Sequence, residues 1–259
     1  LYAPNVTLPK FSPPPQVALV APLRRGTSGS AAFLGLASDG QQYWVKPPSN
    51  PQGSRTLVAE AVAYGIGRLI GAPVPANSLI EIPGAFNWEY AEGRRLRGGT
   101  GHGSLNVEDV VVAEEWGTYS RLDDNRRRQA HILALWDLCM GDDPQWLHQT
   151  TEDYSIWSFD HGFWLAGESD WTIDALKKIA TTPWQFDLDP GVASASGLHE
   201  AADRIDDLTL AMIQAVASSV PLEWETTPQE LSELASILFL RTEGVAERLR
   251  AAANQSRHS

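Results

Sequence analysis

The sequence predicts an α+β protein with a small antiparallel sheet near its N-terminus and a larger, mostly helical part after it. Two observations predict this fold class. Between residues 17 and 83, short apolar segments alternate with turn signals and enclose one helical pattern. Beyond residue 83, apolar residues recur mainly at helical spacing. The chain has 259 residues, of which 43% are hydrophobic, so it is long enough for one two-lobed domain or two small ones.

The first part of the chain is expected to fold in the order β-β-β-α-β. It follows a proline-rich segment, residues 1–16, that predicts an extended arm. The expected strands cover residues 17–20, 32–36, 43–46 and 78–82, and the expected helix covers residues 54–71. Gly71 and the prolines after it stop this helix. We expect residues 17–83 to form an N-terminal lobe in which the helix crosses behind the sheet.

The second part, residues 84–253, is expected to be a helical lobe. It opens with a basic, glycine-rich segment, residues 94–104, that predicts a mobile loop. The expected helices cover residues 123–140, 170–180, 198–218 and 228–253, and a strand is expected at residues 154–159. An acidic loop, residues 141–153, leads into that strand. Residues 254–259 predict a disordered tail.

Composition limits the partners and the compartment that we expect. The net charge of -12 should repel nucleic acid and anionic membranes. No run approaches the roughly 18 apolar residues of a transmembrane helix, and the first residues show no signal-peptide pattern. The single cysteine, Cys139, excludes an internal disulfide and lies in an apolar helical pattern that predicts a core position. We therefore expect a cytoplasmic protein without direct nucleic-acid or membrane contacts.

The most informative segment is an apolar strand, residues 154–159, that ends in Asp160 and then a glycine turn. A carboxylate at the mouth of a buried strand is costly unless a cation meets it. In phosphotransfer enzymes that cation is a nucleotide-bound magnesium ion. Asp160 is therefore a candidate metal ligand, whereas we expect the neighbouring His161 to be a hydrogen-bonded structural residue.

A candidate phosphate site precedes Asp160 in the chain. Lys46 ends the predicted strand 43–46, where it can hold phosphate groups as a point charge. Glu60 is the one acid in an otherwise neutral helical stretch and is a candidate partner for Lys46. Backbone amides and hydroxyls of a glycine loop can also bind an anion, although many hairpins have this composition. The loop is Gly26-Thr27-Ser28-Gly29-Ser30.

A second acidic pair, Asp142-Asp143, lies in the loop after the helix at residues 123–140. A carboxylate there can orient a substrate hydroxyl and accept its proton, and two inert turn residues are the alternative. We expect these acids and Asp160 to share one cleft edge and to hold one or two magnesium ions. A strand lysine, a helix glutamate, a loop acid and a strand-end acid, in this order, are the parts of a protein-kinase-like phosphotransfer site.

The sequence resembles the HipA-like kinases over about residues 24–165. The resemblance implies a bilobed protein-kinase-like fold, ATP and Mg²⁺ as cofactors, and phosphate transfer to a serine or threonine hydroxyl of a protein substrate. The segments that carry it are Gly26 to Ser30, Tyr43 to Lys46, Asn50 to Gly53, Leu57 to Glu60, Gly71 to Pro75, Gly141 to Gln145 and Ser158 to Gly162.

The resemblance also implies roles for individual residues. Lys46 would hold the nucleotide phosphates, and Glu60 would orient the lysine. Residues 80–83, with Glu81 and Ile82, would form a hinge that binds adenine through backbone groups.

The remaining roles fall on the acids. Asp143, beside Asp142, would be the catalytic acid, and Asp160 would bind the metal. The family places a metal-binding asparagine about five residues after its catalytic aspartate, where this chain has Leu147 or His148.

An amide oxygen can bind magnesium, so Gln145 or Gln149 is the candidate replacement for the missing asparagine. Without such a ligand, activity would be weakened or lost. A pseudokinase or a nucleotide-sensing interaction module is therefore the alternative function, and a small-molecule or lipid kinase is a third.

Overall fold

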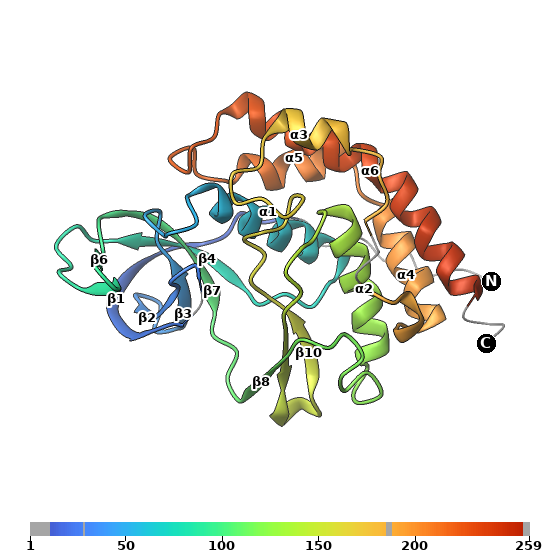
Figure 1. Ribbon diagram of the computed structural model, residues 1–259, viewed down its shortest axis with the longest axis horizontal. Coiled ribbons are helices and arrows are strands. Elements are labelled where there is room, and N and C mark those ends of the chain that lie inside the picture. The colour runs from blue at the N-terminus through green and yellow to red at the C-terminus, as the bar shows by residue number, and fades with distance from the viewer. Residues whose placement is uncertain (1–10, 28, 185–187, 256–259) are drawn as a thin grey trace.

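The computed structural model describes residues 11–255 apart from Ser28 and residues 185–187. Within these residues it contains six α-helices, a closed five-stranded barrel, a three-stranded sheet and a two-stranded sheet. Figure 1 shows the barrel at one end of the molecule and most of the helices at the other, with the first helix between them. No helix in the described part of the chain is long and apolar enough to cross a membrane.

The barrel has the strand order β1-β2-β3-β7-β4. Its strands are β1 (Gln16–Arg25), β2 (Phe33–Ala37), β3 (Gln42–Lys46), β4 (Asn77–Ile82) and β7 (Gly99–Leu105). Register shifts bend β1, so this long strand pairs with β2 and also closes the barrel in parallel with β4. The predicted β-β-β-α-β order over residues 17–83 is confirmed. The sheet, however, is closed and has one parallel pairing.

The prediction of a mobile loop at residues 94–104 is wrong. β6 (Arg94–Arg95) pairs with β5 (Glu89–Ala91), and β7 lies between β3 and β4. The glycines of β7 allow close packing: a Cβ atom on Gly103 would lie 2.5 Å from Ile80 Cγ1. This strand extends the first sheet beyond the expected limit at residue 83.

Helix α1 (Arg55–Ile70) is buried along most of its length. It contacts β7 on one side and the helices α2 (Asn125–Leu138), α4 (Ala195–Asp206) and α5 (Leu210–Ser218) on the other. Gly65 lets α5 approach closely, since a Cβ atom there would lie 2.4 Å from Val216 Cγ1. Gly71 ends the helix with a left-handed φ of 76°. The core thus surrounds α1, which fixes the position of the side chains that α1 presents to the barrel.

The second part of the chain combines helices with a small sheet, in the order β10-β9-β8. Its further elements are β8 (Val110–Ala113), β9 (Trp146–Gln149), η1 (Thr150–Glu152), β10 (Ser155–Ser158), α3 (Ile173–Lys178), η2 (Pro190–Val192) and α6 (Pro228–Gln255). The expected acidic loop, residues 141–153, therefore contains β9. The expected helix 198–218 is two helices, because Thr209 caps α5 by accepting a hydrogen bond from Met212 N.

The ends of the described chain differ from expectation in two respects. Residues 11–15 of the expected arm have no regular secondary structure, and Gln16 already belongs to β1. Asn254 and Gln255, expected in a disordered tail, are the last residues of α6. Residues 1–10 and 256–259 lie outside the described residues. Cys139 is buried, as expected, and burial raises the pKa of its thiol to about 12.

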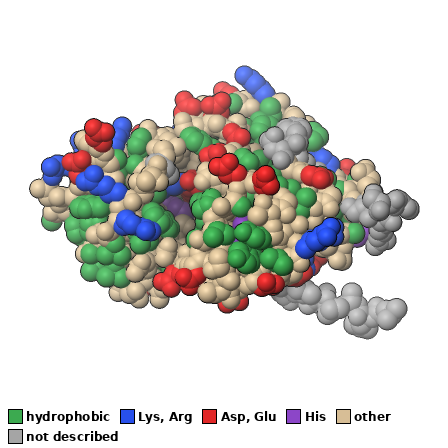
Figure 2. Space-filling model, turned by 60° about the horizontal axis from the view of Figure 1, so that its bottom comes forward, with side chains coloured by type: hydrophobic (Ala, Val, Ile, Leu, Met, Phe, Trp, Pro, Cys, Tyr) green, Lys and Arg blue, Asp and Glu red, His purple; other side chains and the backbone are tan. Residues whose placement is uncertain are grey.

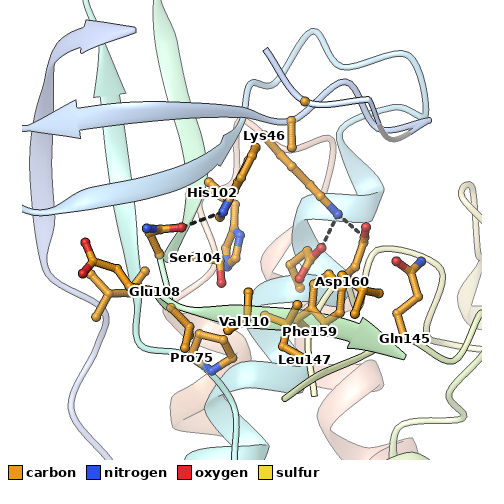
Figure 3. Close-up of a pocket in the computed structure, with 18 of the residues that line it drawn as sticks. Lys46, Pro75, His102, Ser104, Glu108, Val110, Gln145, Leu147, Phe159 and Asp160 are labelled. Carbon is orange, nitrogen blue, oxygen red and sulfur yellow. Dashed lines mark hydrogen bonds and ion pairs between the residues drawn. The ribbon is translucent and has the colours of Figure 1, made fainter. Parts of the chain in front are cut away.

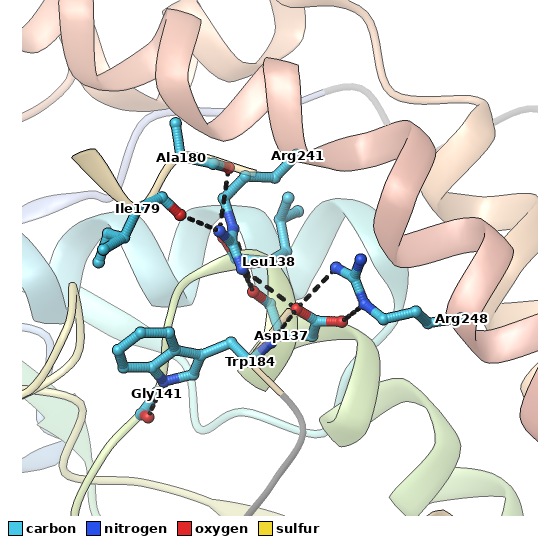
Figure 4. Close-up of polar contacts among 8 residues, drawn as sticks. All are labelled: Asp137, Leu138, Gly141, Ile179, Ala180, Trp184, Arg241 and Arg248. Atoms are coloured by element: carbon cyan, nitrogen blue, oxygen red, sulfur yellow. Dashed lines mark hydrogen bonds and ion pairs between the residues drawn. The ribbon is translucent and has the colours of Figure 1, made fainter. Parts of the chain in front are cut away.

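A buried ion-pair network joins α2 to α6 (Figure 4). Asp137 on α2 is fully buried and pairs with Arg241 (3.1 Å) and Arg248 (2.7 Å) of α6. Arg241 also donates to backbone carbonyls at the ends of α2 and α3, where helices lack internal donors. These acceptors are Asp137 O, Leu138 O, Ile179 O and Ala180 O. The network fixes the end of α2, from which the loop of residues 139–145 departs.

We expect Arg241→Met to destabilise the fold strongly, because it leaves several buried acceptors without a donor. Removing one partner of a buried ion pair costs about 3–5 kcal/mol, and a loss of this size is expected in the free energy of unfolding from urea denaturation. Arg250→Met is the control. Arg250 forms surface ion pairs with Asp203 and Asp206, so its loss should cost less than about 1 kcal/mol. If both variants lost the same free energy of unfolding, the stabilising role assigned to the buried Arg241 network would be wrong.

Candidate functional site

A cleft of about 720 Å³ lies where the barrel meets the three-stranded sheet. It is lined by barrel residues, by the connection between β7 and β8, and by residues of the small sheet (Figure 3). Lining residues used below are Gly26, Thr27, Trp44, Lys46, Glu60, His102, Asn106, Val110, Val112, Gln145, Leu147, Phe159 and Asp160. A volume of this size is typical of a small-molecule site.

Three charged side chains meet at the inner end of the cleft. Lys46 from β3 pairs with Glu60 from α1, and its Nζ atom lies 2.5 Å from Asp160 Oδ1 just after β10. The side chains of Lys46 and Glu60 are only 7% and 5% exposed, while that of Asp160 is 22% exposed. The predicted pairing of Lys46 with Glu60 is present, and Asp160 reaches the same point.

The pKa values of the pair show that both members are charged. Burial by itself lowers the pKa of Lys46, but the charges of Glu60 and Asp160 outweigh burial and raise it above its usual value. Burial by itself raises the pKa of Glu60, and the Lys46 charge and hydrogen bonding from His161 bring it well below its usual range. The cleft therefore ends in a buried ion pair whose members both favour their charged forms.

The turn after β10 is shaped around this pair. Asp160 has a left-handed φ of 57°, which turns the chain at the strand end. A Cβ atom on Gly162 would lie 3.3 Å from Lys46 Nζ, so glycine leaves room for the lysine. His161 shares a 3.0 Å hydrogen bond with Ser158 Oγ and lies 3.6 Å from Glu60 Oε2. His161 is thus buried and hydrogen-bonded, as expected.

The two loop acids do not share this cleft edge. Asp142 and Asp143 are exposed and are not among the residues that line the cleft. Asp142 lies against Gly167, and Asp143 has a left-handed φ of 53° and accepts a 2.9 Å hydrogen bond from Gln145 Nε2. Gln145 does line the cleft. The expected convergence of loop acids with Asp160 is therefore not present in this structure.

Leu147 and His148, one of which stands where the HipA-like pattern has an asparagine, both belong to strand β9. His148 lies in β9, is fully buried, and shares a 3.1 Å hydrogen bond with the backbone carbonyl of Tyr154. Leu147 lines the cleft as an apolar residue, and Gln149 is not in the cleft wall. Among the candidate ligands, only Asp160 and Gln145 lie at the same end of the cleft (Figure 3). A carboxylate and an amide oxygen are ligands that magnesium accepts, but the described residues contain no group of three or more histidine, cysteine or acidic side chains that could hold a metal ion.

The expected hinge is misplaced. Glu81 and Ile82 belong to β4 inside the barrel, Glu81 is exposed, Ile82 is in the barrel core, and neither lines the cleft. Because β7 follows as a fifth barrel strand, the chain leaves the barrel later. Residues 106–109 form the connection to β8 and do line the cleft.

The glycine loop lies partly in the cleft. Gly26 and Thr27 line it, and Gly26 N donates to Ala32 O (2.8 Å) at the base of the hairpin. Gly29 is not among the lining residues. Ser28 lies outside the described residues.

Trp44 and His102 are among the residues of the cleft wall that sequence reasoning missed. Trp44 is two positions before Lys46 on β3 and therefore faces the same side; its indole donates a 3.0 Å hydrogen bond to Asn106 Oδ1. His102 is opposite Lys46 in the β3–β7 register and lies 3.3 Å from Asn77 Nδ2. Alternation along β3 could have indicated Trp44, whereas His102 required knowledge of the β7 pairing.

Comparisons with known proteins agree with this geometry at the level of the fold. No protein-family model matches the chain, and no curated protein matches it. Among solved structures, the chain is similar to CtkA, a proinflammatory kinase of Helicobacter pylori, with a TM-score of 0.59 and 10% sequence identity. The match covers 95% of this chain and 100% of that chain.

The chain has a kinase-like fold. At 10% identity the similarity shows the fold alone, so the resemblance to HipA-like kinases stays a prediction from sequence.

The buried His102 should make the stability of the protein pH-dependent. Burial lowers its pKa from 6.5 to about 4, so between these values only the unfolded chain binds the proton, and stability falls as the pH falls. At about 1.4 kcal/mol per pKa unit, the loss from pH 7 to pH 4 is about 3 kcal/mol. We measure the free energy of unfolding by urea denaturation at pH 7 and at pH 4. Between these pH values, His102→Gln should lose about 3 kcal/mol less of this free energy than the parent protein. The same pH dependence in both proteins would exclude a neutral buried histidine.

Proposed function

We propose that the chain is an ATP- and Mg²⁺-dependent phosphotransferase of the HipA-like kinase type that acts on a serine or threonine hydroxyl of a protein. The observation that carries the proposal is the buried Lys46–Glu60 ion pair beside Asp160 at the inner end of the cleft. Lys46 is a buried cation held by Glu60 of α1 and by Asp160, and it would provide a fixed positive charge for nucleotide phosphates. The kinase-like fold supports this assignment.

Each wall of the cleft has a separate task in this proposal. The ammonium group of Lys46 binds phosphate oxygens, and Glu60 holds the lysine in place. Trp44 and the apolar side chains of Leu147 and Phe159 provide a surface for a planar base. Asp160 and Gln145 would hold magnesium, which neutralises phosphate charge when bound.

The acceptor side of the cleft is less complete. In the proposal, Asp143 orients the acceptor hydroxyl and takes its proton. Because Asp143 is exposed and hydrogen-bonded to Gln145, this role needs the loop of residues 139–145 to move toward the cleft when substrates bind. We propose that the barrel, which has its own core, and the helical part, whose core includes α1, act as two lobes that close around the nucleotide.

A nucleotide-binding module without phosphotransfer is the second candidate. The burial of His148 in β9 favours it, because the position where the HipA-like pattern has a metal-binding asparagine holds a buried histidine instead. Both candidate functions use Lys46 to bind the nucleotide phosphates. They differ in whether Asp143 and a second metal ligand complete a site for phosphate transfer.

Asp160→Asn should separate binding from transfer. The amide keeps the size of the side chain but removes a charge, so we expect phosphate transfer to fall by more than about 100-fold while the thermal unfolding midpoint changes little. Transfer is measured with γ-labelled ATP and Mg²⁺ on the protein itself and on a basic protein such as histone or myelin basic protein. Asp170→Asn, an exposed acid on the same segment, is the control and should remain active. Undiminished transfer by Asp160→Asn would refute the metal-ligand role.

Nucleotide binding should depend on Lys46 even if transfer is absent. We expect Mg-ATP to raise the unfolding midpoint of the parent protein and to quench the fluorescence of Trp44. Lys46→Met should lose both effects, because the cation for the phosphates is gone. Binding without label transfer would favour the second candidate. No binding by the parent protein would contradict both candidates.

A further inference from the structure

The strand β8 is an open edge of the three-stranded sheet. The strand order β10-β9-β8 places β9 on one side of β8, and no described strand lies on the other. Exposed edges are normally shortened, charged or covered, because their free backbone groups pair readily with another extended chain. Figure 1 shows β8 at the margin of the molecule, directly after the connection that lines the cleft.

The hydrogen-bond register identifies the free backbone groups. Thr150 N donates to Asp109 O (2.8 Å), and the next opposed pair is Val110 with Gln149. In an antiparallel ladder, opposed residues alternate between pairs that bond to each other and pairs whose N–H and C=O groups point away. The backbone groups of Val110 and Val112 therefore point to the open edge, and those of Val111 point to β9.

The same strand carries exposed apolar side chains. Val112 is 62% exposed and Val111 is 38% exposed, which is unusual for β-branched residues that pack well in sheets. The face with this sheet is turned toward the viewer in Figure 2, where hydrophobic side chains gather next to acidic ones. An added strand would cover these valines while pairing with the backbone.

Charge indicates which kind of chain fits this edge. Four exposed acids flank the strand, Glu108 and Asp109 before it and Glu114 and Glu115 after it, and none forms an ion pair with another described residue. If a second copy paired antiparallel with β8, acids would face acids at both ends, which is unfavourable. A chain with basic residues at both ends meets opposite charge instead.

We propose that β8 is a docking edge for an extended segment of a partner protein, in which β-branched or apolar residues are flanked by lysine or arginine. The segment adds a fourth strand to the sheet, with backbone bonds at Val110 and Val112 supplying affinity and the four acids supplying selectivity. Because Val110 and Val112 also line the cleft, the docked partner lies beside the proposed nucleotide site.

This docking surface goes beyond the proposed function, since it needs neither nucleotide nor phosphotransfer. Its test uses the whole chain and a synthetic peptide with a Val-Thr-Val centre and two basic residues on each side. Binding is measured by fluorescence anisotropy in low and in physiological salt, without nucleotide. We expect measurable binding that weakens with salt, and none for the same peptide with glutamates in place of the basic residues.

Val112→Pro is the decisive variant. It removes an N–H group that points away from β9, so the β8–β9 ladder stays intact while strand addition is blocked. We expect at least a tenfold loss of peptide affinity, and a similar loss when the peptide is N-methylated at alternate backbone positions and tested on the parent protein. The peptide arm keeps the test decisive if the variant is unstable.

Charge reversal gives a matched control. Glu114→Lys with Glu115→Lys should weaken binding at least tenfold, whereas Glu243→Lys with Glu247→Lys, two exposed acids of α6, should leave it unchanged. The proposal fails if the basic peptide does not bind the parent protein, if Val112→Pro and N-methylation have no effect, or if sedimentation shows that β8 instead pairs two copies of this chain.

Discussion

The buried ion pair between Lys46 and Glu60 is the interaction on which the arrangement of the cleft depends. An ammonium group at 7% exposure is tolerated only when carboxylates compensate it. β3 must therefore lie against α1, and the turn after β10 must bring Asp160 to the same point. One electrostatic requirement thus fixes three segments that are far apart in the sequence, and the cleft is the space that they enclose.

A second buried ion-pair network fixes the positions of helices in the second part of the chain. Asp137 and Arg241 hold the ends of α2 and α3 against α6, and α2 packs on α1. The loop with Asp142 and Asp143 starts at the fixed end of α2 but then runs exposed. Its base is held by the buried network, while its two acids lie at the surface, and the proposed role of Asp143 requires this surface part of the loop to move.

The sequence predicted local secondary structure well. It also predicted contacts where a charged residue in an apolar segment requires a partner of opposite charge. Periodicity predicted the β-β-β-α-β order, and the apolar surroundings of Lys46, Glu60 and Asp160 indicated their convergence. The strand β7 was missed because its glycines, needed for close packing in the barrel, are also typical of loops. That error displaced the hinge to Glu81 and Ile82. The burial of His102 could not be predicted, because it depends on a pairing between distant strands.

The small sheet affects the two parts of the proposed function, nucleotide binding and phosphate transfer, differently. Residues 146–149 pair with β8 and β10 as strand β9, and His148 is buried where the HipA-like pattern would have a metal-binding asparagine. The same ladder holds β8 in place and creates its open edge. The buried Lys46–Glu60 pair needs only β3 and α1 and is formed in the structure, whereas the proposed acceptor role of Asp143 depends on the loop before β9. A partner chain docked on β8 would add one strand to this sheet, beside the cleft that Val110 and Val112 line.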